Sequence, residues 1–507
     1  MCRLKKVESV EVSNHRRLRL GRFTDLCGTE SADQQWLRMT IDELPDDALL
    51  EIFSSYMAHP PPPPSYEEDA WHILVHVCRR WRRLIFGSPR RLDLRLLCIN
   101  RRLLKALDIW PELPIIIRVD DENFYQLPSI TNVISVLRRQ DRLVKIFMHD
   151  IPNWFLKEVA MTSEPFPALI ELKLFLASFE NYPQILPDTF LGGSVPRLRS
   201  FTLWGIPFPA LGKLLSSACD LVTLTLCFEA DSEYLSPDAM VDILSILTRL
   251  TSLDLYVGTY KFWTRGASRP PAAPTRVVLP TLTNFDFGGD GVYLDGIMSR
   301  IDAPLDCIAV TFSSDERLCD IPLLCDFIGR TKIPNVPYRA DISDHTNAEI
   351  SLFQRRGDID FKVLNVEFPY SSHGYDTQLE SLAEACSLLS PLLSSLEHLS
   401  IYQHQRNFRL LRDMQYNTEW MEILCAFTSV KDLILDGPAG LSVASALQEP
   451  AGEQVTEILP ELQNIFLEGL QSSSVPEGIA KFIGARGLSG PPVVVHQQES
   501  GAVINVL

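Results

Sequence analysis

The sequence lacks the features that mark a membrane-embedded or secreted protein. No run of about 18 apolar residues occurs, which argues against a transmembrane helix. Residues 1–6 are basic, but no apolar stretch follows them, so the sequence predicts no signal peptide. We therefore expect a soluble protein of the cytoplasm or the nucleus.

Motifs of metal, cofactor and nucleophile sites are also missing. The 11 cysteines include no CxxC pair, which favours reduced and often buried thiols. His72 and His76 are helically spaced but lack a third ligand nearby, so they indicate a packed helix face rather than a metal site. No GK[ST] follows the turn at 288–291, and no GxSxG signature stands out. We expect no cofactor, no metal and no catalytic residue.

Positive charge is scarce outside the N-terminal fifth of the chain. The net charge is −17, yet residues 1–102 hold 17 Lys and Arg against 14 Asp and Glu, so the acidic excess lies in the remainder. A nucleic-acid binder would need a basic face, so we expect neither a nucleic acid nor a membrane as partner. One dense basic cluster remains, which is either a solvated helix face or a contact for an acidic partner: Arg79, Arg80, Arg82, Arg83, Arg90, Arg91 and Arg95.

Residues 41–98 predict a small helical module. Pro45 suits the first turn of a helix, and the two acids that follow it lie near the positive end of the helix dipole. An apolar stripe at helical spacing follows: Leu49, Ile52, Phe53 and Tyr56. A second apolar block runs over 71–85 and is stopped by Gly-Ser-Pro at 87–89. This core is small for an independent domain, so the module needs a partner or a neighbour.

Three short motifs of this module, taken in order, resemble the F-box. They are Leu44-Pro45, Ile52-Phe53 and Val77-Cys78-Arg79-Arg80-Trp81. In that family the helices dock on a Skp-type adaptor, which ties the protein to a cullin ubiquitin ligase of the SCF type. The resemblance implies an adaptor-binding set of Leu44, Pro45, Leu49, Ile52, Phe53, Val77, Cys78 and Trp81. The chain departs from the family in a longer first loop, with five prolines at 60–64 and three acids at 67–69.

A repeat fills the region after the module. The template apolar-x-x-apolar-x-apolar occurs eleven times, at starts 143, 169, 198, 221, 250, 282, 305, 361, 396, 430 and 462. The one gap of 56 residues suggests a hidden copy near Ile333, Val336 and Tyr338. Helix signals lie between copies, such as the Ser-Pro-Asp that opens a helix at 236–246 and the helix candidates at 376–396, 418–424 and 475–484.

A strand followed by a helix at this period is typical of a leucine-rich-repeat solenoid. We therefore predict an α/β chain with a flexible tail (1–40), an F-box helical module (41–98) and a leucine-rich-repeat-like solenoid of about 11–12 units (99–507). The array resembles the irregular leucine-rich repeats that commonly follow an F-box in fungal families. The Asn or Cys usual after the template is missing from most copies. Two segments, 258–280 and 340–360, break the period, and we expect them to be exposed loops or lips over a binding surface.

Side chains alternate across a strand, so the residues between template positions face away from the core. We expect this open face to bind the substrate through Lys173, Trp204, Asp254, Tyr256, Asp286, Tyr402 and Asp436. Aromatic anchors among acids suit a protein client with basic residues. An ordinary solvated sheet face is the alternative.

An enzyme with a barrel fold is the less favoured alternative, with Asp254, Asp286 and Asp436 as acid and base. Outward-facing positions explain these carboxylates without catalysis, and eleven or twelve units are too many for an eight-stranded barrel. We expect a non-catalytic ligase subunit that joins a Skp-type adaptor and a cullin core to an unknown protein substrate. The second hypothesis is a repeat-based interaction scaffold without a ligase role, in which the helical module caps the solenoid.

Overall fold

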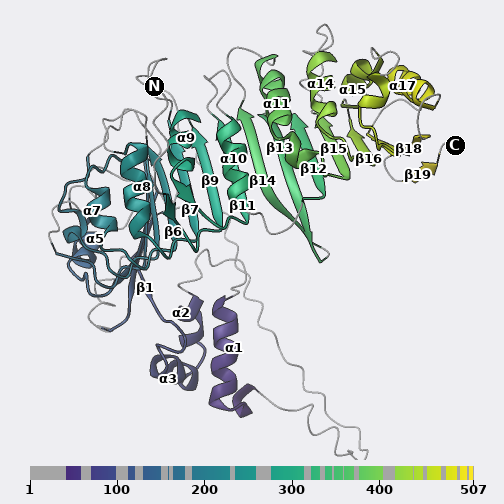
Figure 1. The fold of residues 1–507 in the computed structure, drawn as a ribbon. Coiled ribbons are helices and arrows are strands. Elements are labelled where there is room, and N and C mark those ends of the chain that lie inside the picture. Colours follow the sequence, from purple (N-terminus) through teal and green to yellow (C-terminus); the bar gives the residue numbers. More distant parts are fainter. Residues whose placement is uncertain are drawn as a thin grey trace, which may run out of the picture. The chain divides into compact units, whose positions relative to one another are not determined.

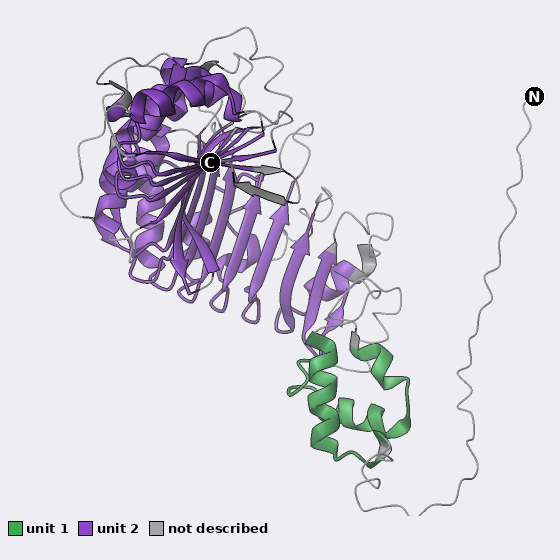
Figure 2. Cartoon of the chain, turned by 90° about the vertical axis from the view of Figure 1, so that its right-hand side faces the viewer, with its two compact units in different colours: residues 1–93 green, residues 94–507 purple. Residues whose placement is uncertain are grey.

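The structure is a computed structural model of the 507-residue chain. It describes residues 41–58, 70–98, 112–119, 130–149, 158, 164–176, 185–228, 235–258, 276–289, 291–312, 321–331, 337–344, 347–357, 359–369, 376–403, 417–437, 439–448, 454–469, 475–487, 492–499 and 502–505. The predicted tail, the proline-rich insertion, most of the 258–280 loop, and Ile333 and Val336 of the hidden copy lie outside these residues. The chain forms two compact units, 1–93 and 94–507, so the division falls five residues before the predicted boundary (Figure 2).

The first unit is a cluster of short helices. It contains a 3-10 turn (η2, Ile41–Glu43) and the helices α1 (Asp46–Ala58), α2 (Ala70–Val75) and α3 (Arg79–Gly87). Helix α1 begins directly after Pro45, with two acids in its first turn, as the sequence predicts. Its stripe of Leu49 and Phe53 packs with Trp71 and Ile85 to form the core of the unit.

The second unit contains a 17-stranded sheet (Figure 1). Its strands in spatial order are β1 (Leu96–Leu97), β2 (Ile115–Val119), β3 (Leu143–Met148), β4 (Glu171–Phe175), β5 (Ser200–Trp204), β6 (Thr223–Phe228), β7 (Ser252–Val257), β9 (Asn284–Gly289), β11 (Cys307–Phe312), β14 (Ile359–Pro369), β13 (Asn347–Arg356), β12 (Arg339–Asp344), β15 (His398–Gln403), β16 (Asp432–Asp436), β17 (Asn464–Glu468), β18 (Val494–Glu499) and β19 (Ala502–Asn505). A separate pair is formed by β8 (Val277–Val278) and β10 (Ile301–Asp302).

Helices lie between successive strands and cover one face of the sheet (Figure 1). They are α5 (Ile130–Leu137), η5 (Phe190–Gly193), α7 (Leu211–Leu215), α8 (Pro237–Ile246), α9 (Gly291–Met298), α10 (Ile321–Thr331), α11 (Asp376–Leu388), α12 (Ser390–Leu393), α14 (Asn417–Cys425), α15 (Ala439–Gln448), α16 (Gln454–Glu457) and α17 (Glu477–Gly487). Helix α8 opens as predicted, because the Ser236 hydroxyl accepts the Ala239 amide at 3.3 Å. No helix in the described part of the chain is long and apolar enough to cross a membrane.

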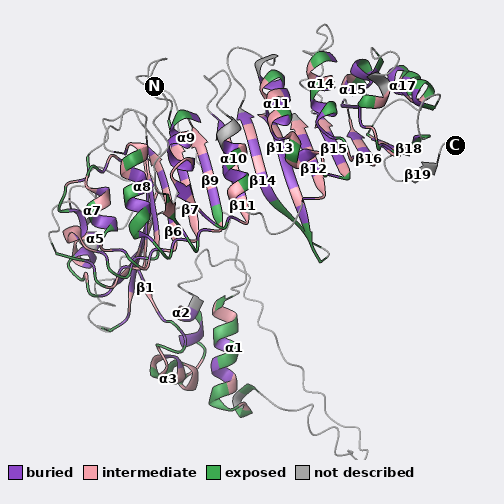
Figure 3. Cartoon of the chain, in the orientation of Figure 1, coloured by how far each residue is buried: buried purple, intermediate pink, exposed green. Residues whose placement is uncertain are grey.

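The repeat template forms the core. Neighbouring copies pair in register, so that Leu224, Leu253 and Phe285 lie side by side on three strands. Every template residue except Phe361 is buried, and most residues between them are more exposed, with Thr202, Val363 and Ser400 as buried exceptions (Figure 3). Burying one such side chain contributes about 1.5–3 kcal/mol, and stacking lets each unit cover the apolar edge of the next. These strand–helix units define a leucine-rich-repeat-like solenoid.

The 56-residue gap contains β12 and β13, and β14 carries the next template copy; we call these three the inserted strands. An array strand does lie close to the predicted hidden copy, because Ala340 and Ile342 of β12 pair in parallel with the template residues Leu399 and Ile401. Strand β13 runs antiparallel to both β12 and β14, while β14 pairs in parallel with β11 and β12 with β15. The 340–360 segment is therefore mostly sheet, which corrects the prediction of a loop. Phe361 lies within β14 and is 40% exposed; Leu143 likewise lies within β3 but is buried, and the other first template residues lie before their strands.

The sheet of the described residues is open. Its pairings run from β1 to β19, and none joins the two end strands. The closed barrel of the enzyme alternative is therefore absent from the part of the chain that the structure describes.

Candidate functional site

Arginines of the predicted basic cluster hold the helical module together. The Arg80 guanidinium donates to Asp46 Oδ1 (2.6 Å) and to the Leu44 carbonyl (2.6 Å). Arg91 donates to Asp47 at 2.7 Å and to Glu51 at 2.8 Å. These contacts join α3 and the segment after it to the start of α1, so part of the cluster is structural.

The predicted adaptor-binding residues divide between surface and core. Ile52 and Val77 are 44% and 57% exposed, and Pro45 is exposed as well. Leu44, Cys78 and Trp81 are half-buried.

Leu49 and Phe53 are fully buried, and the Phe53 ring packs on Trp81 with a centroid distance of 4.7 Å. The surface role predicted for these two does not fit the fold, because their face of α1 is used to hold the helices together. Ile41 and Ile73, which the sequence analysis did not select, are exposed apolar residues of the same unit.

The open face of the sheet carries two rows of side chains that run across the strands. The fourth-position row, four residues after each template start, includes Thr225, Asp254 and Asp286. The sixth-position row, six residues after each template start, includes Trp204, Cys227, Tyr256, Gly288, Thr311 and Glu367. Parallel pairing in register keeps each row continuous from β5 to β14.

Aromatic rings follow the sixth-position row. Phe175 lies 6.3 Å from Trp204, and Trp204 lies 5.1 Å from Tyr256, measured between ring centroids. The small side chain of Cys227 stands between the last two rings in sequence register, which lets them meet across β6. The row thus offers a half-buried aromatic platform on the open face.

Three carboxylates lie beside this platform. Tyr256 donates its hydroxyl to Asp286 Oδ2 at 2.8 Å. Thr225 donates to Asp254 Oδ2 at 2.8 Å, and Thr311 donates to Glu367 Oε2 at 3.2 Å. The side-chain amide of Asn347 also donates to Glu367. Within the described residues, no Lys, Arg or His forms an ion pair with any of the three carboxylates.

The electrostatics of this cluster favour a positive charge. Burial raises the pKa of Asp286, the nearby carboxylates of Asp254 and Glu367 add to the rise, and the hydroxyl of Tyr256 opposes it. Burial and the hydrogen bond to Asp286 likewise raise the pKa of the Tyr256 hydroxyl, so it stays protonated. A cation placed here would relieve like-charge repulsion.

The remaining predicted substrate-binding residues lie elsewhere on the open face. Lys173, on β4, forms an ion pair with Glu171 at 2.8 Å. Glu171 also pairs with Lys145, and these two lysines lower the pKa of its carboxyl although burial alone would raise it. Tyr402 and Asp436 face each other in register on β15 and β16, beyond the inserted strands. The structure therefore brings Trp204, Asp254, Tyr256 and Asp286 together, and leaves the other three apart.

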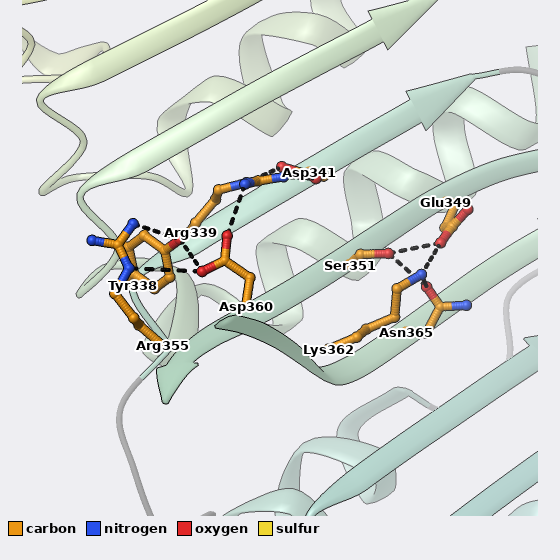
Figure 4. Close-up of polar contacts among 9 residues, drawn as sticks. All are labelled: Tyr338, Arg339, Asp341, Glu349, Ser351, Arg355, Asp360, Lys362 and Asn365. Atoms are coloured by element: carbon orange, nitrogen blue, oxygen red, sulfur yellow. Dashed lines mark hydrogen bonds and ion pairs between the residues drawn. The ribbon is translucent and has the colours of Figure 1, made fainter. Parts of the chain in front are cut away.

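The charged side chains of the inserted strands that Figure 4 draws pair with one another. Arg339 bonds both oxygens of Asp341, at 2.7 and 2.5 Å, and reaches Asp360 at 3.3 Å. Lys362 donates to Glu349 at 2.9 Å. This part of the sheet has its acids and bases already paired.

Sequence reasoning missed Glu367, Thr311 and Gly288. All three lie six residues after the start of their template copy, as do Trp204 and Tyr256. Reading the whole row across copies, rather than choosing charged and aromatic residues one at a time, would have found them. Among the described residues, no group of three or more His, Cys, Asp or Glu could hold a metal ion.

Comparison with known proteins adds little. No protein-family model matches the chain, and no curated protein matches it. Among solved structures, it is similar to the leucine-rich repeat-containing protein LegL7 from Legionella pneumophila, with 14% identity and a TM-score of 0.26. That match covers 66% of this chain and 95% of LegL7. The assignment as a leucine-rich-repeat-like solenoid rests on the strand register and the burial of the template, not on this likeness.

Proposed function

We propose that the chain is the substrate-recognition subunit of a cullin-type ubiquitin ligase. In this proposal the helical module docks a Skp-type adaptor, and the solenoid holds a protein substrate near the ubiquitin-charged enzyme. The chain itself does no chemistry, because proximity alone raises the rate of transfer.

Exposed apolar side chains on the helical module are the observation that supports this proposal most. Ile52, Ile73 and Val77 are each 44% or more exposed, although the described residues of the unit form only three short α-helices. Arginine contacts and the Phe53–Trp81 pair already stabilise the module from within. Large apolar residues left on the surface of so small a unit fit a second polypeptide.

The second candidate is an interaction scaffold without a ligase role. The burial of Leu49 and Phe53 favours it, because two residues of the motif that resembles the F-box are occupied in holding the module together. The open face of the solenoid would bind its partner in the same way under either candidate.

Capture of a purified Skp-type adaptor by the full chain distinguishes the two. We expect the wild-type chain to retain the adaptor and Ile52→Asp with Val77→Asp to lose it, because both changes place charge in an apolar contact. Both residues are exposed, so the module should stay folded. Leu441→Asp is the matched control, since Leu441 is an equally exposed leucine on α15 of the other unit. Failure of the wild-type chain to bind any adaptor would favour the scaffold, and undiminished capture by the double variant would show that Ile52 and Val77 do not make the contact.

A further inference from the structure

The centre of the open face differs from its two sides in charge pairing. At β3 and β4, Glu171 is paired with Lys145 and Lys173. At the inserted strands, each acid of Figure 4 has a basic neighbour, as in the pair of Lys362 and Glu349. Asp254 and Asp286 lie between these regions, and Glu367 lies further along β14; among the described residues, all three are bonded only to hydroxyl and amide groups. Within the described residues, the centre of the face is therefore negative without a paired counter-charge.

The aromatic platform lies on the same strands as these carboxylates. Tyr256 belongs to the platform and also donates to Asp286, so ring face and carboxylate are adjacent. Gly288 makes this arrangement possible, because a Cβ at that position would meet Tyr256 Cδ1 at 2.7 Å. An electron-rich ring face beside a carboxylate attracts a cation twice, through the ring quadrupole and through direct charge.

We propose that this surface binds a segment of a protein partner whose arginine side chain stacks on Trp204 and Tyr256 and reaches Asp286. The inference rests on the proposed function only in calling that partner a substrate. The proposed ligand is an arginine side chain within a peptide segment, and it binds on the open face between β5 and β14.

Arginine fits this surface better than lysine for two reasons. Its planar guanidinium stacks on an aromatic ring, whereas an ammonium is a compact and strongly hydrated charge. Its five donors also suit acceptors that are already partly used. One oxygen of Asp286 accepts from the Tyr256 hydroxyl, and the two oxygens of Asp254 accept from Thr225 (2.8 Å) and Ser252 (3.3 Å). Each carboxylate oxygen has two lone pairs, so acceptor positions remain on both side chains for a forked donor.

The test uses the full chain and a short fluorescent glycine–serine peptide that carries two arginines. Two matched peptides replace arginine by citrulline, which keeps the shape and removes the charge, or by lysine. We expect the citrulline peptide to bind about tenfold more weakly, or more, since it loses the charge-assisted hydrogen bonds. The lysine peptide should bind more weakly than the arginine peptide. Equal binding of the citrulline peptide would overturn the proposal, and equal binding of the lysine peptide would overturn the choice of arginine.

Variants of the chain locate the contact. Asp286→Asn keeps the size of the side chain and should weaken arginine-peptide binding by about fivefold or more. Trp204→Ala should weaken it as well. Asp242→Asn is the matched control, because Asp242 is an exposed acid on α8 and its loss changes the net charge equally. The same loss of affinity in Asp242→Asn and Asp286→Asn would show attraction by net charge alone and would contradict the site.

The peptide experiment and the adaptor experiment test different claims, and either claim can be wrong while the other stands. Peptide binding without adaptor capture removes the ligase role and leaves this inference standing. Adaptor capture with equal binding of the arginine and citrulline peptides does the reverse.

Discussion

Gly288 controls the direction of the Tyr256 side chain. The ring of Tyr256 lies across this glycine, and the hydroxyl thereby reaches Asp286 on the same neighbouring strand. A residue without a side chain is thus part of the candidate site. Its role is to leave room rather than to make a contact.

Gly288→Ala should disturb this arrangement. The new Cβ would meet the Tyr256 ring at 2.7 Å, so the ring must turn and its hydroxyl must leave Asp286. We expect weaker binding of the arginine peptide, with a small loss of stability of about 1 kcal/mol from the crowding. Peptide titration and thermal unfolding measure the two effects. Unchanged affinity would show that the direction of the Tyr256 ring does not matter for binding.

The raised pKa of Asp286 predicts a second effect, on stability. The native state keeps this proton to a higher pH than the unfolded chain does, so stability falls as pH rises from the usual Asp value to the raised one. The titrating and charged groups around Asp286 are Asp254 and Tyr256 on β7, Cys307 on β11 and Glu367 on β14. Above the raised pKa of Asp286 the destabilisation is complete.

Asp286→Asn should therefore raise the melting temperature at neutral pH, and the advantage over wild type should shrink below the usual pH range of Asp titration. We expect less than about 1 kcal/mol, because the side chain is partly exposed and solvent screens the charge. Asp242→Asn should show no such change. A variant less stable than wild type at neutral pH would mean that the Tyr256–Asp286 bond outweighs the repulsion.

Among the elements, strands were easier to predict than their connections. All eleven template copies coincide with strands, because a period-two pattern on a fully buried face leaves little choice of register. The arrangement of β12, β13 and β14 was not predictable. These three strands lie in the sheet in the reverse of their order along the chain. Its polar residues looked like a loop because ion pairs, such as those of Arg339 with Asp341 on the same strand and with Asp360 on β14, neutralise them on the open face.

The candidate site shows the same limit. Trp204, Asp254, Tyr256 and Asp286 were predicted because the alternation of a strand assigns their face. Glu367 joins them only because β14, and not β12, is the strand that pairs with β11. Topology of this kind is a long-range property that local sequence does not carry.

Helix packing at the C-terminal end depends on one glycine of α17. A Cβ on Gly478 would meet the Ala444 carbonyl oxygen at 1.8 Å and is blocked by the backbone of α15. Gly478→Ala should lower the free energy of unfolding by about 1–3 kcal/mol, because the two helices must separate. Denaturant unfolding measures this loss.

Gly484 provides the control within the same helix. Nothing lies within 4 Å of a Cβ built there, and the residue is exposed. Gly484→Ala should stabilise the chain by about 0.5–1 kcal/mol through helix propensity. Equal effects of the two substitutions would contradict the close approach of α15 and α17.

At the scale of the whole molecule, the two proposed activities lie in different compact units. Distant substitutions without shared contacts usually act additively. We expect Ile52→Asp with Val77→Asp to leave arginine-peptide affinity unchanged, and Asp286→Asn to leave adaptor capture unchanged. Pull-down and peptide titration on the same preparations measure both. Cross-effects in either direction would show that the units are coupled.

The reversed order of β14, β13 and β12 sets a rule for how the array assembles. In a simple stack each new unit adds to the one before it, so structure can zip from one end as the chain emerges. Here β11 pairs with β14, whose last residue is Pro369, and not with β12, which is synthesised earlier. We therefore expect sheet growth from the N-terminal end to stop at β11 until β14 is available. The units from β15 onward join the N-terminal part of the sheet only after β12, β13 and β14 have paired.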